Sequence, residues 1–123
     1  MNPRPQRVQL FRKKGFNLQA ESLRLNGLRA QSVRRGRRDF FGNPFRQAEA
    51  VTAGRPNPRA WVVWAFEEWL KADGDPQVRG LYPEKRARLL ANLWRLQGKN
   101  VGCACGLHEP CHGDVLLRLA NAD

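Results

Sequence analysis

KNVGCACGLHEPCHGDVLLRLA, residues 99–120, carries the strongest structural signal in this chain. Its first part, residues 99–105, is short and apolar, which favours a buried strand. Residues 113–120 carry apolar side chains at helical spacing and predict a last helix. The positions expected to face inward are Val115, Leu116, Leu119 and Ala120. A strand, a loop and a helix in this order form the αβ unit of a layered fold.

Two further strands are expected upstream of this unit. Residues 7–12, RVQLFR, alternate apolar and polar side chains and predict a short strand, followed by a turn at Gly15. Leucines recur between residues 17 and 29, but Asn26 and Gly27 interrupt them and predict a turn before a second short strand over 28–34. The length of 123 residues fits one domain spanning 1–123.

The middle of the chain predicts two helices. Residues 54–58, GRPNP, break regular structure, after which Asn57 can cap a helix that has Pro58 in its first position and runs to about residue 71. Its apolar face consists of Val62, Phe66, Trp69 and Leu70, widened by Trp61, Trp64 and Ala65. Tryptophans at this spacing favour a core role over a base-stacking platform. Residues 72–80 are expected to form a loop.

The second of these helices starts at Pro83 and is expected to end at Gly98. Its apolar side would carry Leu89, Leu90, Leu93, Trp94 and Leu96.

The positive charge is concentrated in the first third of the chain. The net charge is +11, and residues 1–46 hold twelve basic side chains against two acidic ones. Residues 47–123 are nearly balanced, with ten basic and nine acidic side chains. Such an asymmetry favours a polyanionic partner, because neutralising phosphates releases counterions. A membrane surface is disfavoured, since no basic amphipathic helix with bulky apolar anchors accompanies the charge.

Residues 34–45, RRGRRDFFGNPF, are expected to form a loop that contacts a ligand. Their arginines suit phosphate oxygens, since a guanidinium donates in a fork. The candidate phosphate-binding residues are Arg34, Arg35, Arg37 and Arg38. Asn43 would either read a polar group of the ligand or brace the turn of residues 42–44.

All the cysteines and histidines of the chain lie within ten residues: Cys103, Cys105, His108, Cys111 and His112. An odd, local set of thiols does not suit a disulfide framework. If residues 101–105 are extended, Cys103 and Cys105 lie on the same face. Cys111 and His112 would start the last helix, where backbone N–H groups and the helix dipole favour a thiolate and lower its pKa.

Three interpretations of this cluster stay open. The first is a metal site, most simply zinc, that uses four or fewer of the five side chains; with one ligand missing, water would fill the open position. The second is a catalytic thiol, with Cys111 or Cys105 as nucleophile, a histidine such as His112 as acid or base, and Asp114 orienting the imidazole. The third is packing and helix capping alone.

The chain resembles the mostly phage and bacterial family catalogued as domain of unknown function 4326. Three blocks carry the resemblance: PQRVQLFRKKGF, then VRRGRRDFFGNPF from residue 33 to residue 45, and GKNVGCAC-x5-CHGDVLL-x-LAN near the end. It implies one compact domain with residues 42–45 near the Cys/His loop and Arg34 or Arg35 in the same pocket. Where the family has a four-residue spacer, this chain has GLHEP, which makes His108 an additional candidate ligand.

The C-terminal pattern is also similar to a second uncharacterised group of small α/β proteins. This similarity implies a small α/β domain with a short, mostly parallel sheet flanked by helices, in a Rossmann-like arrangement. Residues 1–46 would contribute strands and the arginine-rich loop, and residues 98–123 the strand-loop-helix unit. Ligands bind beyond the carboxyl ends of the strands in such sheets, where both loops would meet.

Two hypotheses of function follow. The first is a small phage-type accessory protein that acts on or binds a nucleotide or nucleic acid, with zinc or a thiolate beside a phosphate-binding loop. The second is a non-catalytic module that binds nucleic acid or a host protein and uses its metal only structurally. The absence of a long apolar run favours a cytoplasmic protein, in the host cytoplasm if phage-encoded. The oligomeric state stays open.

Overall fold

A computed structural model describes residues 3–34 and 41–122 of the chain. Its strands β1 (Arg7–Gln9), β2 (Ala30–Ser32) and β3 (Asn100–Cys103) form one sheet in the order β1-β3-β2. Both outer strands run parallel to β3, so the predicted parallel α/β architecture is confirmed. Each strand lies inside the range expected for it and is shorter than that range.

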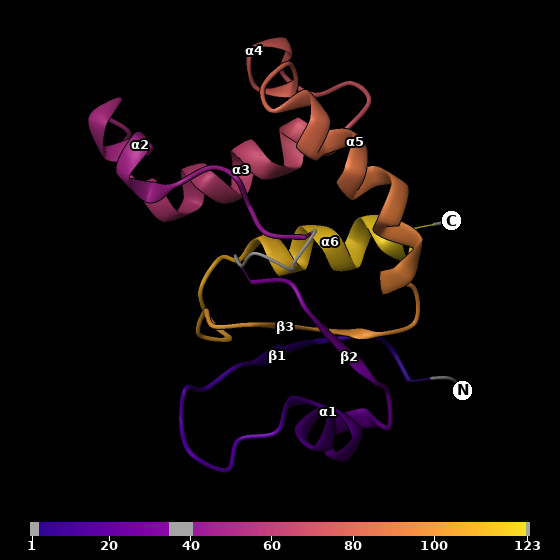
Figure 1. Cartoon of the computed structure of the whole chain (residues 1–123). Helices are drawn as coiled ribbons and strands as arrows, with labels where there is room; N and C mark the ends of the chain where they lie inside the picture. Colours follow the sequence, from indigo (N-terminus) through magenta and orange to yellow (C-terminus); the bar gives the residue numbers. More distant parts are fainter. Residues whose placement is uncertain (1–2, 35–40, 123) are drawn as a thin grey trace.

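Helices cover both faces of this sheet (Figure 1). Helix α1 (Leu18–Asn26) packs on one face and α6 (His112–Ala120) on the other. Helix α3 (Pro58–Leu70) packs on α6, on its side away from the sheet. The remaining elements are α2 (Gln47–Thr52), α4 (Pro76–Arg79), α5 (Pro83–Asn92) and the short 3-10 helix η1 (Leu93–Leu96). None of the helices in the described ranges is long and apolar enough to cross a membrane.

The central strand is buried along its whole length, which suits a parallel strand covered on both faces. A Cβ atom on Gly102 would lie 3.0 Å from both terminal carbons of Leu18, so glycine lets α1 approach the sheet closely here. The buried amide of Asn100 donates to Ser22 Oγ at 2.7 Å and to Asn26 Oδ1 at 2.8 Å. This polar network joins the start of β3 to α1.

Helix α3 forms as predicted. The side chain of Asn57 accepts a hydrogen bond from the N–H of Ala60 at 3.2 Å, and Pro58 is the first helical residue. The predicted apolar face is confirmed, since Val62, Phe66, Trp69 and Leu70 are all buried. Trp69 belongs to the core and Trp61 packs against it, whereas Trp64 is 43% exposed.

Several local expectations need correction. The expected loop 72–80 contains α4, where Asp75 accepts from the N–H of Gln77 at 2.9 Å. Trp94 was expected inside but is 66% exposed, because the α-helical hydrogen bonding ends at Asn92 and the chain tightens into η1. The turn at Asn26 and Gly27 is present, with Gly27 at a φ of 78°, but it closes a helix, α1, that the leucine spacing did not predict.

Candidate functional site

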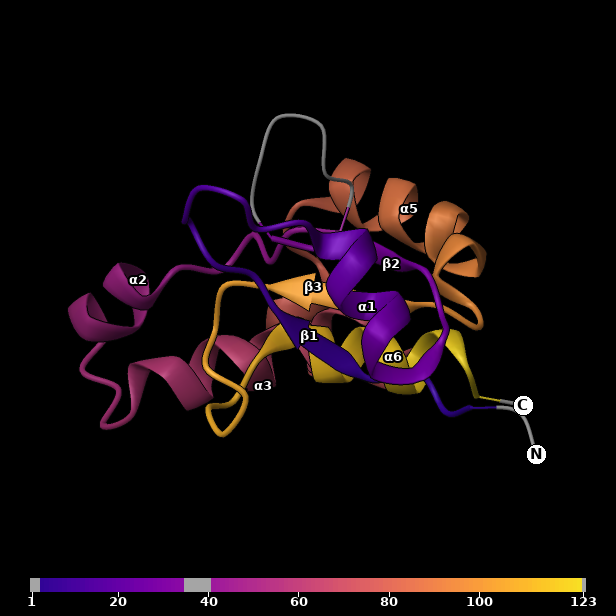
Figure 2. The ribbon, with the colours of Figure 1, turned by 90° about the horizontal axis from the view of Figure 1, so that it is seen from below.

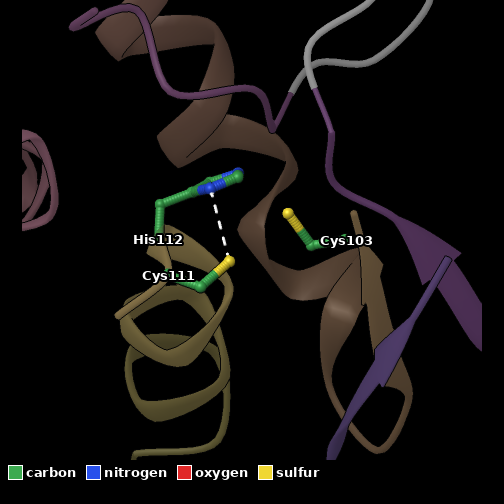
Figure 3. Close-up of side chains that lie close together, drawn as sticks. All are labelled: Cys103, Cys111 and His112. Atoms are coloured by element: carbon green, nitrogen blue, oxygen red, sulfur yellow. Dashed lines mark hydrogen bonds between the residues drawn. The ribbon is translucent and has the colours of Figure 1, made fainter. Parts of the chain in front are cut away.

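The end of β3 and the start of α6 bring Cys103, Cys111 and His112 together. One ligand atom from each of these side chains lies within 4.8 Å of the other two, and all three residues are buried (Figure 3). Cys111 Sγ lies 3.9 Å from His112 Nδ1. Two thiols and one imidazole at this separation form a group that could hold a metal ion.

The neighbouring residues Cys111 and His112 reach the same place because they sit on either side of a helix start. Cys111 is extended, with φ −149° and ψ 141°, and its Sγ accepts the N–H of Gly113 at 3.4 Å as the N-cap of α6. His112 is the first helical residue. The change of backbone direction between them turns both side chains toward Cys103 (Figure 3).

The imidazole of His112 is held from its far side. His112 Nε2 lies 2.6 Å from the backbone oxygen of Val33, which can only accept, so Nε2 carries the proton. The lone pair of Nδ1 then faces the sulfur of Cys111. The ring of Phe66 also packs edge-on against the imidazole, with centroids 5.1 Å apart and planes at 84°. Metal-binding histidines are commonly oriented in this way by a carbonyl on their other nitrogen.

Asp114 does not orient the imidazole of His112, although the catalytic-thiol interpretation requires this. Its carboxylate, half-exposed, pairs with Arg7 Nε at 3.5 Å. The carbonyl of Val33, and not Asp114, therefore orients His112. This corrects the role that the sequence analysis gave to Asp114.

The other two candidate ligands lie outside the group of three. Cys105 Sγ lies 3.7 Å from Cys103 Sγ, so these two thiols are neighbours, as predicted from their shared strand face. Cys105 Sγ also accepts a hydrogen bond from Arg59 Nη1 at 3.7 Å. His108 is exposed on the loop between β3 and α6. Cys105 is thus adjacent to the candidate centre, and His108 is directed to solvent.

Hydrogen bonding and burial set the acidity of the three thiols. The hydrogen bond from the Cys111 thiol lowers the pKa of Cys103. The same bond, together with burial, raises the pKa of Cys111, and burial raises the pKa of Cys105. The expectation that the helix start lowers the pKa of Cys111 is wrong: the Gly113 N–H acts in that direction, but the bond to Cys103 and burial outweigh it.

Arg7, which the sequence analysis did not single out for the site, anchors the loop that carries these residues. Its Nη2 donates to three backbone oxygens, those of Gly106 at 3.2 Å, Leu107 at 2.6 Å and Glu109 at 2.9 Å. Its side chain is only 6% exposed and also pairs with Asp114. One side chain on β1 therefore fixes the path of the chain from β3 to α6.

Replacing Arg7 with methionine should loosen this loop. We expect the free energy of unfolding to fall by about 1.5–3 kcal/mol or more. This is the range for one hydrogen bond from a charged donor, and Arg7 makes several. Urea denaturation followed by circular dichroism measures the change. Arg12→Met is the matched control, because Arg12 is exposed on the following loop and should leave the stability almost unchanged. Equal effects of the two substitutions would contradict the anchoring role.

A pocket of about 280 Å³ opens beside the candidate centre. Its walls combine the three cysteines and His112 with the guanidinium groups of Arg34 and Arg59, and with Asn43. The structure thus places Arg34 and Asn43 beside the Cys/His loop, as the family resemblance implied. Arg35, Arg37 and Arg38 lie outside the described residues. Arg59, on the first turn of α3, is a pocket residue that the sequence analysis missed.

Asn43 braces its own turn. Its Nδ2 donates to the backbone oxygen of Val62 at 2.9 Å, and its Oδ1 accepts the N–H of Phe45 at 2.9 Å. Both ends of the amide are therefore used within the protein. Of the two roles considered for Asn43, the structural one is realised here.

Fold and site together define a small parallel α/β domain in which a buried Cys/Cys/His group borders an arginine-lined pocket. The chain belongs to the family described as domain of unknown function DUF4326, which it matches over residues 17–122. The match begins directly after the first of the three blocks that carry the resemblance, PQRVQLFRKKGF at residues 5–16. No curated protein and no solved structure matches the chain.

Proposed function

We propose that the chain is a zinc-binding domain that holds a phosphate group of a nucleotide or nucleic acid in the pocket beside the metal. The single observation that carries this proposal is the common pocket, because it is lined both by the Cys103, Cys111 and His112 group and by two arginines.

The donor set favours zinc over other common ions. Thiolate and imidazole are the ligands that zinc takes in proteins, whereas magnesium and calcium prefer oxygen. The carbonyl of Val33 leaves Nδ1 of His112 available as a donor. Zinc binds the thiolate form of cysteine, so its binding would release the thiol protons of Cys103 and Cys111.

The arginines supply the affinity for phosphate in this proposal. Arg34 is exposed at the pocket, and within the described ranges its guanidinium has no hydrogen-bond or ion-pair partner. Arg59 pairs with Glu109, with Nε and Oε2 3.3 Å apart, so a phosphate would compete with this carboxylate for its guanidinium. The excess of basic residues in the first third of the chain would draw a polyanion toward this side.

Two versions of the metal site differ in the role of Cys105. With three protein ligands, zinc keeps a fourth position for water or a substrate atom, which supports hydrolytic catalysis. With Cys105 as a fourth ligand the site would be closed and structural, which favours the non-catalytic binding module. The 3.7 Å between the sulfurs of Cys103 and Cys105 is the observation behind this alternative.

Arg34→Ala should weaken the binding of a fluorescent nucleotide and of a labelled oligonucleotide by about tenfold or more, because a charged hydrogen bond to phosphate is lost. The slope of log affinity against log salt should fall by about one. Fluorescence anisotropy of the zinc-loaded protein at several salt concentrations measures both quantities.

The matched control is Arg88→Ala, since Arg88 is also exposed but lies on α5. An equal loss in both variants would mean that net charge, and not the pocket, sets the affinity. An unchanged affinity in Arg34→Ala would contradict phosphate binding at the pocket.

A further inference from the structure

A second hollow lies at the same edge of the sheet. The carboxyl ends of the parallel strands β1 and β3 lead into loops 10–16 and 104–111, which Figure 2 shows at the same end of the sheet. A hollow of about 290 Å³ is lined by Phe11, Lys13 and Phe16 of the first loop, by Arg24 of α1 and by Leu107 of the second. None of these residues has a role in the candidate metal centre.

The hollow presents an aromatic ring to solvent. Phe11 is 49% exposed although it is large and apolar. The ring of Phe16 packs edge-on against it, with centroids 5.8 Å apart and planes at 73°, which holds the Phe11 ring in place. An exposed, supported ring of this kind offers a surface on which a nucleobase can stack.

Positive charge lies next to this ring and on its loop. Lys13 Nζ lies 5.5 Å from the centroid of Phe11, and Arg12 and Lys14 are exposed on the same loop. Among the described residues, Glu21 supplies the one carboxylate that lines the hollow, and this carboxylate is paired with Arg24. The hollow therefore combines an apolar stacking surface with the ammonium group of Lys13, and proteins that hold single-stranded nucleic acid combine stacking with positive charge in this way.

The hollow and the metal pocket border the same loop. Leu107 lines the hollow, whereas Cys105 and Pro110 line the metal pocket. Arg7, which also lines the hollow, holds the backbone of this loop. The hollow and the metal pocket therefore share the loop 104–111 as a common wall.

We propose that the hollow at Phe11 is a base-stacking site for single-stranded nucleic acid, and that the ligand of the metal pocket is a strand of DNA or RNA. The second half of this statement rests on the proposed function. The first half stands on the hollow alone.

Phe11→Ala should weaken the binding of a labelled 12-nucleotide single strand by about 5- to 100-fold, the effect of removing one stacking partner. The affinity for a mononucleotide should stay unchanged, because the mononucleotide occupies only the metal pocket. Phe11→Trp should restore or strengthen binding of the single strand. Anisotropy titrations with oligo-dT, oligo-U and a matched duplex measure these affinities and show whether DNA or RNA is preferred.

The matched control is Trp94→Ala, which removes an exposed aromatic ring that lies beside an arginine in η1. It should bind the single strand like the unchanged protein. Unaltered strand binding in Phe11→Ala, equal losses in both variants, or duplex binding as tight as single-strand binding would each overturn the stacking site. Failure of the mononucleotide to bind the unchanged protein would overturn the proposed function instead, and leave the Phe11 result to be judged separately.

Discussion

Cys111→Ser is expected to abolish stoichiometric zinc binding. The unchanged protein, purified under reducing conditions, should carry one equivalent of zinc. Serine keeps the size of the side chain and can still cap α6, but its hydroxyl is a far weaker zinc ligand than a thiolate. Only two of the three grouped side chains would remain, and the zinc content should fall close to zero. Inductively coupled plasma mass spectrometry on the purified proteins measures it.

The two histidines provide a matched pair for this prediction. His112→Ala should lose zinc as Cys111→Ser does, because His112 supplies the third donor atom. His108→Ala should keep one equivalent, since His108 is exposed on the loop that precedes α6. Full zinc content in both Cys111→Ser and His112→Ala would mean that this group is not the metal site.

Phe66→Ala should lower the free energy of unfolding more than the other substitutions proposed for this protein. Phe66 is fully buried in α3, and its ring contacts both Trp69 and His112. Removing a buried aromatic ring costs about 3–5 kcal/mol, a large share of the 5–15 kcal/mol that is typical for a domain. The midpoint of urea denaturation should fall accordingly, with an unchanged slope. Zinc affinity should also fall, because the imidazole loses the ring that packs against it.

Trp64→Ala is the control within the same helix. Trp64 is 43% exposed, so its removal should change the free energy of unfolding by less than about 1 kcal/mol. Stability losses of the same size at Phe66 and Trp64 would contradict the packing described for α3.

The elements that the sequence predicts well are those with local signals. Asn57 and Pro58 mark the start of α3 through capping geometry that involves only neighbouring residues. The strand-loop-helix unit at the C-terminus follows from apolar patterning alone, and with it the position of Cys111 and His112 at a helix start. The family resemblance adds the approach of Arg34 and Asn43 to this unit.

The features that sequence reasoning missed depend on contacts between distant parts of the chain. In the sequence, nothing near Arg7 distinguishes it from the other basic residues of the first third. Only the pairing of β1 with β3 brings it to the loop at 106–109. Asn100 lies in an apolar strand, where its partners on α1 give no local signal. The group that orients His112 is the backbone carbonyl of Val33, 79 positions away in the sequence, and not the carboxylate of the nearby Asp114.

Electrostatics near the thiols was predicted wrongly for a similar reason. The backbone N–H groups at the start of a helix lower the pKa of a cysteine there, and the helix start at Cys111 can be predicted from the sequence. The opposing influence comes from Cys103, whose distance from Cys111 is set by the packing of β3 against α6. Knowledge of the local element alone therefore gives the wrong direction for the pKa of Cys111.

Zinc K-edge X-ray absorption on the purified protein is the sharpest test of the proposed metal site, because it reports the atoms bound to the metal. We expect two sulfur ligands at about 2.3 Å, or three if Cys105 also binds, together with one imidazole nitrogen at about 2.0–2.1 Å. Protein that contains no zinc, or zinc surrounded by oxygen and nitrogen without sulfur, would contradict it.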